Sequence, residues 1–169
     1  MAEIVLGTGM TRGAVYFHFT SKADLAKTLV DLHQASWPAL RLAVDGEGLQ
    51  GLYAVHRMLE RLSHQLLDDV LSRAAIRLSR EADRIDIEFE SPFEAWTDYI
   101  GYRLRQAQLL GQMRGNLDPV LYAGIIVGMF LGVDEYFSDT LQDTPFVSGA
   151  SRSLDAMLEM VLRGLSVAG

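Results

Sequence analysis

The residues from Thr11 to Lys22 have the types and spacing that could do chemistry in this 169-residue chain. Arg12 is followed by Gly13 and Ala14, whose small size would let the backbone approach another molecule closely. A guanidinium can donate two parallel hydrogen bonds to the edge of guanine, which is the commonest specific contact between a protein and a base. The stretch therefore favours nucleic-acid recognition, provided that local structure presents these side chains on one face.

The sequence around these residues predicts the elements that would present them. Gly7 and Gly9 bracket a tight turn, because glycine adopts positive φ values freely. Thr11 is a favourable N-cap for a short helix over Arg12–Phe17, and Ser21 caps the helix that begins at Lys22. A helix end, a glycine turn and a short second helix form a helix-turn-helix, whose second helix enters the major groove of DNA.

The run GTGMTRGAVYFHFTSKADL resembles the DNA-binding segment of TetR-family transcriptional repressors, and most of all the branch of γ-butyrolactone autoregulator receptors of actinobacteria. The resemblance is tight over residues 2–36. Beyond them it consists of the helix layout and of Phe93-Glu-Ala-Trp96. It implies an all-α fold, with a helix-turn-helix followed by a helical ligand-binding and dimerisation domain. It also implies a repressor that a small apolar effector, of the γ-butyrolactone class, releases from its operator.

The resemblance implies two sets of site residues. Arg12 would read a guanine edge, and the polar side chains around it would hold phosphates, as the histidine equivalent to His18 does in the family. The expected DNA-binding residues are Thr11, Arg12, Gly13, Ala14, Tyr16, His18 and Lys22. In the butyrolactone-receptor branch a tryptophan on the helix of Trp96 contacts the ligand, whereas periodicity alone favours a core tryptophan. Helix faces suggest further ligand-binding residues, namely Met58, Leu62, Ile100, Val127 and Phe130.

Two features of the sequence argue against DNA binding. The net charge is −7, and residues 1–36 hold three basic and three acidic residues, whereas DNA-binding proteins usually carry a basic patch. The first helix of a TetR-type domain and the front of the second do not appear in this sequence, which indicates a mis-set start, a fragment or a loss of DNA binding. A helix of about six residues is unstable without a partner. The alternative is therefore a dimeric ligand-binding or interaction protein that has lost DNA binding through N-terminal truncation. We give the motif more weight, because a few well-placed contacts determine register and sequence.

The remaining chain predicts a series of amphipathic helices and no strands. The domain division that we expect places a partial helix-turn-helix domain with its connecting helix at 1–44 and the ligand-binding and dimerisation domain at 45–169. Leu25, Leu29, Leu32 and Leu40 would form the apolar face of the connecting helix. The expected helices cover residues 22–44, 49–71, 72–80, 93–113, 118–141 and 150–166, with loops at 45–48, 81–90 and 142–149.

Three glycines at a spacing of four lie on one face of the helix expected at 118–141: Gly124, Gly128 and Gly132. Glycine inside a helix costs about 1 kcal/mol relative to alanine, so the close approach of another helix would explain them. We expect the helices at about 118–141 and 150–166 to pair with their copies in a homodimer with twofold symmetry. Such a dimer would match a pseudo-palindromic operator.

The sequence offers no positive indication of catalysis, a metal site or a cofactor. The acidic stretch 81–90 lacks the glycine and the terminal glutamate of a calcium loop, and His56 and His64 are eight residues apart rather than three or four. No nucleophile, phosphate or dinucleotide motif occurs. The absence of cysteine fits a reducing cytoplasm. The longest apolar run, residues 120–133, is shorter than the about 20 residues of a membrane span. We therefore expect a cytoplasmic protein that is not an enzyme.

Overall fold

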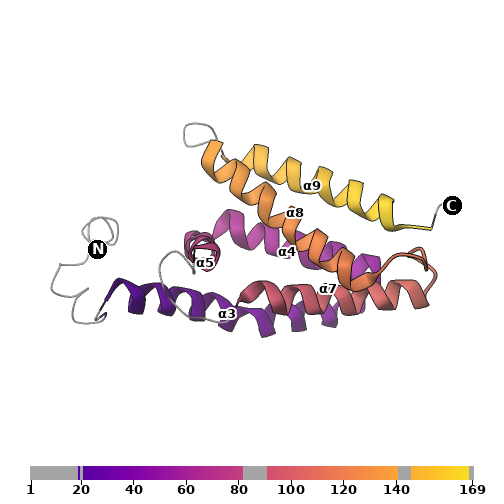
Figure 1. Ribbon diagram of the computed structural model, residues 1–169, viewed down its shortest axis with the longest axis horizontal. Helices are drawn as coiled ribbons and strands as arrows, with labels where there is room; N and C mark the ends of the chain where they lie inside the picture. Colours follow the sequence, from indigo (N-terminus) through magenta and orange to yellow (C-terminus); the bar gives the residue numbers. More distant parts are fainter. Residues whose placement is uncertain (1–18, 20, 82–90, 141–145, 168–169) are drawn as a thin grey trace. The chain divides into compact units, whose positions relative to one another are not determined.

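The computed structural model describes residues 19, 21–81, 91–140 and 146–167, and within them the side chains outside 134–152. In this part of the chain the regular elements are all helices, which confirms the all-α prediction (Figure 1). The expected helix at Arg12–Phe17 lies outside the described residues. The helices are α3 (Lys22–Gly46), α4 (Leu52–Asp68), α5 (Val70–Arg80), α7 (Pro92–Leu109), α8 (Pro119–Thr140) and α9 (Phe146–Leu165).

The chain divides into two compact units. The first comprises Met1–Ser36 and Val70–Glu90, and the second comprises Trp37–Asp69 and Ser91–Gly169. Helix α3 belongs to both, because the division falls between Ser36 and Trp37. These units are defined by packing within the chain, so the expected functional division at residue 44 stays a prediction.

The first unit contains the beginning of α3 together with α5. Ser21 caps α3 as expected, since its Oγ accepts a hydrogen bond of 3.0 Å from the backbone N–H of Asp24. Val30 is fully buried, and Nδ1 of His33 lies 3.2 Å from Oγ of Ser72 on α5. The expected apolar face was wrong at Leu32, which is 61% exposed, because the buried arc of α3 runs through Val30 and His33 instead.

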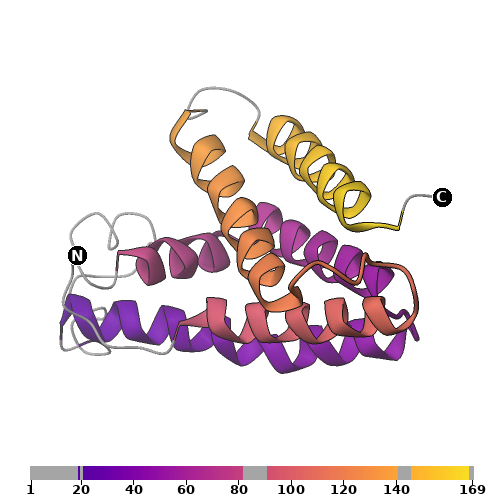
Figure 2. The ribbon, with the colours of Figure 1, turned by 45° about the vertical axis from the view of Figure 1, so that its right-hand side comes forward.

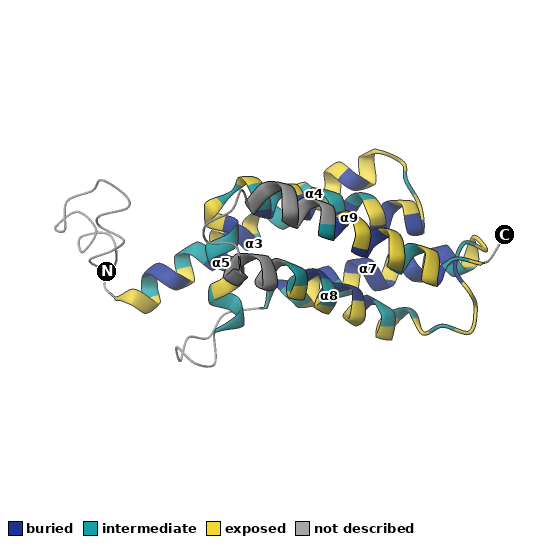
Figure 3. Cartoon of the chain, turned by 90° about the horizontal axis from the view of Figure 1, so that it is seen from above, coloured by how far each residue is buried: buried dark blue, intermediate teal, exposed yellow. Residues whose placement is uncertain are grey.

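The second unit is a helical bundle whose core lies between α4, α7, α8 and α9. Helix α7 packs against α4 and α8, and α9 packs against α4 and α8 (Figure 2). Each of these helices turns an apolar stripe inward, so buried residues line the interior of the unit (Figure 3). The largest fully buried side chains of this unit are Phe130, Met58, Leu59, Leu62, Ile100, Leu104, Met113, Ile126 and Leu158.

Local backbone geometry accounts for most differences from the expected helix ends. The helix expected at 49–71 is shorter, because Gly51 has a φ of +58° before it and Asp69 is extended after it. Helix α7 ends at Leu109 rather than near Met113, because Gly111 with a φ of +69° interrupts the chain. Helix α9 begins at Phe146 and not at residue 150, so the expected loop up to 149 was wrong in its last part.

The end of α9 is tied to the turn that follows α7. The backbone N–H of Arg114 donates to the carbonyl of Leu165 at 3.1 Å, and that of Val167 donates to the carbonyl of Gln112 at 3.2 Å. These bonds satisfy groups at a helix end that would otherwise lack partners. Among the described helices, none combines the length and the apolar character that crossing a membrane requires.

Candidate functional site

The structure places Trp96 at the centre of an aromatic cluster inside the second unit. Its side chain is 2% exposed. The ring of Phe93 lies 5.8 Å from it and that of Phe130 lies 6.1 Å from it, both nearly edge-on. Trp37 on α3 approaches the same indole, with centroids 6.3 Å apart and planes tilted by 37°. Edge-on and tilted aromatic pairs at such distances are favourable, so these rings stabilise the interior.

The sequence of α7 explains why Trp96 points inward. Ser91 caps the helix by accepting a hydrogen bond from the N–H of Phe93, and Pro92 occupies the first turn, where its missing N–H costs nothing. From this start Trp96, Tyr99, Ile100 and Arg103 recur at intervals of three and four, which places them on one buried side of the helix.

The other five expected ligand-binding residues also lie in the interior of the second unit. Phe130 contacts Trp96 directly. The exposed fractions of Met58, Leu62, Ile100, Val127 and Phe130 are all between 0% and 4%. The helix-face argument therefore located buried positions correctly. Whether these side chains contact a ligand stays a prediction.

Sequence reasoning missed Trp37 and Tyr99. The two rings meet edge-on with centroids 5.8 Å apart, and Trp37 also contacts Trp96. Tyr99 could have been found from its spacing of three residues from Trp96 along one helix. Trp37 had no such signal, because it lies on a different helix and its contact with α7 is purely tertiary.

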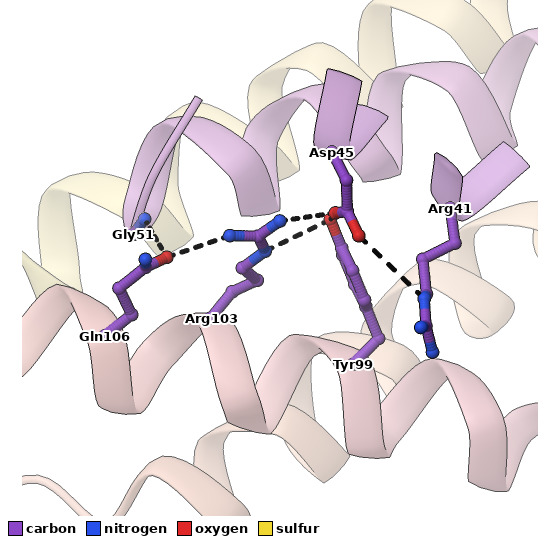
Figure 4. A network of polar contacts seen from close by, with 6 residues as sticks. All are labelled: Arg41, Asp45, Gly51, Tyr99, Arg103 and Gln106. Atoms are coloured by element: carbon purple, nitrogen blue, oxygen red, sulfur yellow. Dashed lines mark hydrogen bonds and ion pairs between the residues drawn. The ribbon is translucent and has the colours of Figure 1, made fainter. Parts of the chain in front are cut away.

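A polar network lies next to the aromatic cluster and joins α3, α4 and α7 (Figure 4). The hydroxyl of Tyr99 donates to Oδ1 of Asp45 at 2.8 Å, and the guanidinium of Arg103 pairs with the same carboxylate. Nε of Arg103 donates to the Tyr99 hydroxyl at 3.2 Å, and another guanidinium nitrogen donates to Oε1 of Gln106 at 3.0 Å. Arg41 reaches the outer side of Asp45 at 3.9 Å. Arg103 is only 7% exposed, so these contacts supply the partners that a buried charge needs.

The network shifts the pKa values of its members. Burial alone would raise the pKa of Asp45, but hydrogen bonds from Tyr99 and Arg103 and the charge of Arg103 outweigh it, so the pKa is lowered. Burial and the hydrogen bond to Asp45 raise the pKa of Tyr99 to about 12. Burial tends to lower the pKa of Arg103, but its hydrogen bonds to Tyr99 and Asp45 give a net increase. At neutral pH the inner part of the network therefore contains the carboxylate of Asp45, the guanidinium of Arg103 and the neutral phenol of Tyr99, and the guanidinium of Arg41 lies on its outer side.

The same network reaches the start of α4. Oε1 of Gln106 accepts a hydrogen bond from the N–H of Gly51 at 3.0 Å, and Oε1 of Gln112 accepts one from the N–H of Leu52 at 2.9 Å. Two side chains from α7 and its following turn therefore satisfy donors at the start of α4. A Cβ atom at Gly51 would clash with Gln112 and lie 3.0 Å from Cα of Ala107, so a glycine is required there.

Of the expected DNA-binding residues, the structure describes Lys22 alone. It is exposed at the start of α3. Thr11, Arg12, Gly13, Ala14, Tyr16 and His18 lie outside the described residues.

The outward side of α8 exposes apolar and small side chains. Val120 and Leu121 are 58% and 59% exposed, and a Cβ atom at Gly124, Gly128 or Gly132 would have nothing within 4 Å. Met160 on the neighbouring helix α9 is 60% exposed. The glycines therefore do not provide space for the chain's own core. They leave a smooth outer surface on the helix that was expected to form a dimer.

Comparisons with known proteins agree with this arrangement. The model of the family "Bacterial regulatory proteins, tetR family" matches residues 1–29. The A-factor receptor protein of Streptomyces griseus is 29% identical over an alignment that covers 79% of this chain and 45% of that protein. The chain thus spans less than half the length of this curated relative.

Solved structures match over nearly the whole chain. One, described as the molecular basis for control of antibiotic production by bacterial hormones, is 33% identical with a TM-score of 0.79, and the match covers 97% of this chain and 85% of that chain. Another is the TetR family protein CprB of Streptomyces coelicolor in complex with its operator sequence, at 27% identity and a TM-score of 0.83, covering 98% of this chain and 77% of that chain. The segment matched at the N-terminus, the helical body and these relatives together show that the chain belongs to the TetR family of bacterial regulatory proteins.

Proposed function

We propose that this chain acts as a ligand-responsive transcriptional repressor, which a small apolar effector of the γ-butyrolactone class releases from operator DNA. The observation that carries the proposal is the burial of Trp96 in an aromatic cluster within a helical body, in a chain of this family. Ligand sites for small molecules are lined mainly by apolar and aromatic side chains. The resemblance of Phe93-Glu-Ala-Trp96 to the butyrolactone receptors favours this effector class, as does the similarity to an A-factor receptor.

The apolar interior around Trp96 would hold the effector. Met58, Leu62, Ile100, Val127 and Phe130 are the other residues that we propose for the site. All are buried in the same unit as Trp96. An effector that binds one form of the protein better than another shifts the population toward that form. Coupling between two sites is commonly about 1–3 kcal/mol, or roughly 5–150-fold in affinity.

The DNA-binding part would be residues 1–44, and the ligand-binding and dimerisation part residues 45–169. Arg12 would read a guanine edge, Gly13 and Ala14 would allow close approach, and the polar side chains of Thr11, Tyr16, His18 and Lys22 would hold phosphates. The match of the family model to residues 1–29 and the solved complex of a similar protein with its operator support this assignment.

The dimer would form through α8 and α9. Their exposed apolar residues and the glycines of α8 lie on the outside of the single chain, where a second copy could pack closely. A twofold dimer would present two recognition helices to a pseudo-palindromic operator. The target of the proposed dimer would be operator DNA in the cytoplasm.

The experiment combines DNA selection with a ligand titration. The full chain is used to enrich sequences from a random pool of double-stranded DNA, and the enriched DNA is then titrated with a hexyl-substituted γ-butyrolactone. We expect an enriched pseudo-palindrome that the probe releases from the wild-type protein. In Trp96→Ala that is shown to be folded, we expect retained DNA affinity and loss of release, because the contact through which the effector favours the released form is lost.

The variant Leu109→Ala serves as the control, because Leu109 is on the same helix and 89% exposed. Its release by the probe should match that of the wild type. Release of Trp96→Ala at the wild-type probe concentration would make Trp96 a core residue without a role in effector binding. Probe binding with no enriched DNA would favour a dimeric ligand-binding or interaction protein.

A further inference from the structure

Three aromatic contacts of Trp96 lie within the described part of the chain, and the three neighbours differ in how much room they leave for a ligand. Phe93 is on the same helix as Trp96, so backbone geometry fixes their separation. Phe130 on α8 is completely buried. Trp37 comes from a different helix and is half-buried. Of these three contacts, the one with Trp37 is therefore the one that can open without disrupting the core or the helix that carries Trp96.

The two indoles are close enough to contact each other. Carbon atoms in contact lie about 3.5–4.0 Å apart, so a ring between two parallel indoles needs a separation of about 7–8 Å. The centroids of Trp37 and Trp96 are 6.3 Å apart, and their planes are tilted by 37°. If the distance between the centroids of the two indoles increased by roughly 1 Å, a flat ring would fit between them, because it needs one contact distance to each indole.

The polar network determines how closely Trp37 approaches Trp96. Asp45 lies on the same helix as Trp37, and Arg103 and Tyr99 of α7 both bind its carboxylate. The Tyr99 ring also touches Trp37 edge-on. Residues of α7 therefore hold α3 at two places. One is the aromatic contact at Trp37, and the other is the ionic contact at Asp45, which Figure 4 shows.

We infer that Trp37 is a second ligand-contacting residue, which forms with Trp96 a site of two indoles for the lactone ring and alkyl chain of the effector, and that Asp45 and Arg103 position it by tying α3 to α7. This inference rests on the proposed function and adds a residue that lies outside the helix of Trp96. The ligand class is a small ring with an alkyl chain, because two indoles offer broad apolar faces and the residues behind them are aliphatic or aromatic.

The first test measures the affinity of the hexyl-substituted γ-butyrolactone by calorimetry in the full chain. Trp37→Ala is expected to raise the Kd about tenfold or more, because one of the two walls is lost, and Trp37→Phe is expected to raise it less. Leu42→Ala is the matched control, since Leu42 is on the same helix and 73% exposed, and its Kd should be that of the wild type. Thermal unfolding of each variant identifies any that fail to fold.

The second test uses the circular dichroism couplet that two nearby indoles produce. The wild type should show a couplet that Trp37→Phe abolishes, and the probe should change its amplitude by altering the angle and distance between the rings. Asp45→Asn should change the couplet without any ligand, although both tryptophans are retained. Arg41→Ala is the control, because Arg41 is exposed and meets only the outer side of the same carboxylate.

The outcomes separate this inference from the proposed function. If Trp96→Ala weakens probe binding while Trp37→Phe and Trp37→Ala leave the Kd unaltered, Trp37 is not part of the site and the proposed function stands. If the probe does not bind the wild-type chain, the proposed effector class is wrong and the inference falls with it. An unchanged couplet in folded Asp45→Asn would overturn the positioning role.

Discussion

Helices α7 and α8 pack against each other but distribute polar and apolar residues in opposite ways. Helix α7 buries a charged residue, Arg103, which is 7% exposed. Helix α8 is apolar nearly all round and yet leaves Val120, Leu121 and Ile125 exposed. Hydrophobicity alone therefore does not tell which side of a helix faces the core.

The difference follows from the partners that each helix has within the chain. Arg103 can be buried because Asp45, Tyr99 and Gln106 supply acceptors for its guanidinium. No atom of the described residues lies within 4 Å of a Cβ atom placed on the three glycines of α8, so the described part of the chain leaves this side of the helix uncovered. The buried charge of Arg103 therefore indicates a polar contact between helices of the same chain, and the exposed apolar residues of α8 indicate a surface for association with another chain.

The largest effect is expected on the inner side of α8. Phe130→Ala should lower the free energy of unfolding by about 3–5 kcal/mol, because Phe130 is fully buried against Trp96 and its removal leaves a cavity. Urea denaturation followed by circular dichroism measures this, with Leu109→Ala as the exposed control. A loss below about 1 kcal/mol would mean that the core around Trp96 collapses onto the vacated space.

The next effect tests the buried charge of α7. Arg103→Met should lower the free energy of unfolding by about 2–3 kcal/mol, because Asp45 and Gln106 lose a charged donor that methionine cannot replace. The side chain of Asp45 is 37% exposed, so water can solvate its carboxylate when the arginine is removed. The loss of stability should therefore be smaller than for a fully buried ion pair. The double variant Asp45→Asn/Arg103→Met should cost less than the sum of the two single variants, as a double-mutant cycle would show. Additive losses would argue against a direct tie.

A smaller and different effect is expected on the outer side of α8. Gly128→Leu should leave the folding of the single chain intact, since nothing lies within 4 Å of a Cβ atom there. It should weaken the proposed dimer, because overpacking a close contact typically costs about 1–3 kcal/mol. Analytical ultracentrifugation of Gly128→Leu and of Gly115→Ala, a control in the loop before α8 with equally open space, measures the dimer. An unchanged dimer in Gly128→Leu would place the interface elsewhere.

The fold was largely predictable because helical periodicity is a local property of the sequence. The spacing of apolar residues over 49–71 predicted one apolar face formed by Leu52, Val55, Leu59, Leu62, Leu66 and Val70. The first five are buried, but Val70 is 66% exposed, because α4 ends at Asp68 and the periodicity is interrupted there. The prediction was wrong for Leu32, because only tertiary packing determines which arc of α3 is covered. It was also wrong for the start of α9, because Gly149 and its neighbours read as a loop although the helix continues through them.

The candidate site was predictable only where the resemblance or the periodicity of one helix reached it. Trp96 and Phe130 were named from the sequence and meet in the structure. Trp37 and the pair of Asp45 with Arg103 were not named, since each involves residues more than fifty positions apart. Asp45 was assigned to a loop next to two glycines, and nothing in the sequence links it to an arginine on a later helix.

The last prediction concerns the phenol at the junction of the aromatic cluster and the polar network. Because its pKa is raised to about 12 from an ordinary value of 10.0, the folded state favours the neutral form of Tyr99. The stability that this shift contributes is present below pH 10.0 and is lost as the pH rises through about 12. Between pH 10.0 and about 12, the free energy of unfolding of Tyr99→Phe should therefore fall less than that of the wild type.

Ultraviolet absorbance of phenolate measures the same effect directly. The difference between the titrations of wild type and Tyr99→Phe should show a step near pH 12, which belongs to Tyr99. Tyr102→Phe is the matched control, because Tyr102 also lies against the Arg103 guanidinium on α7 but is 55% exposed. A step near pH 10 for Tyr99 would mean that Asp45 does not hold its hydroxyl in solution. Of the two α7 residues that bind the Asp45 carboxylate of α3, Arg103 alone would then remain.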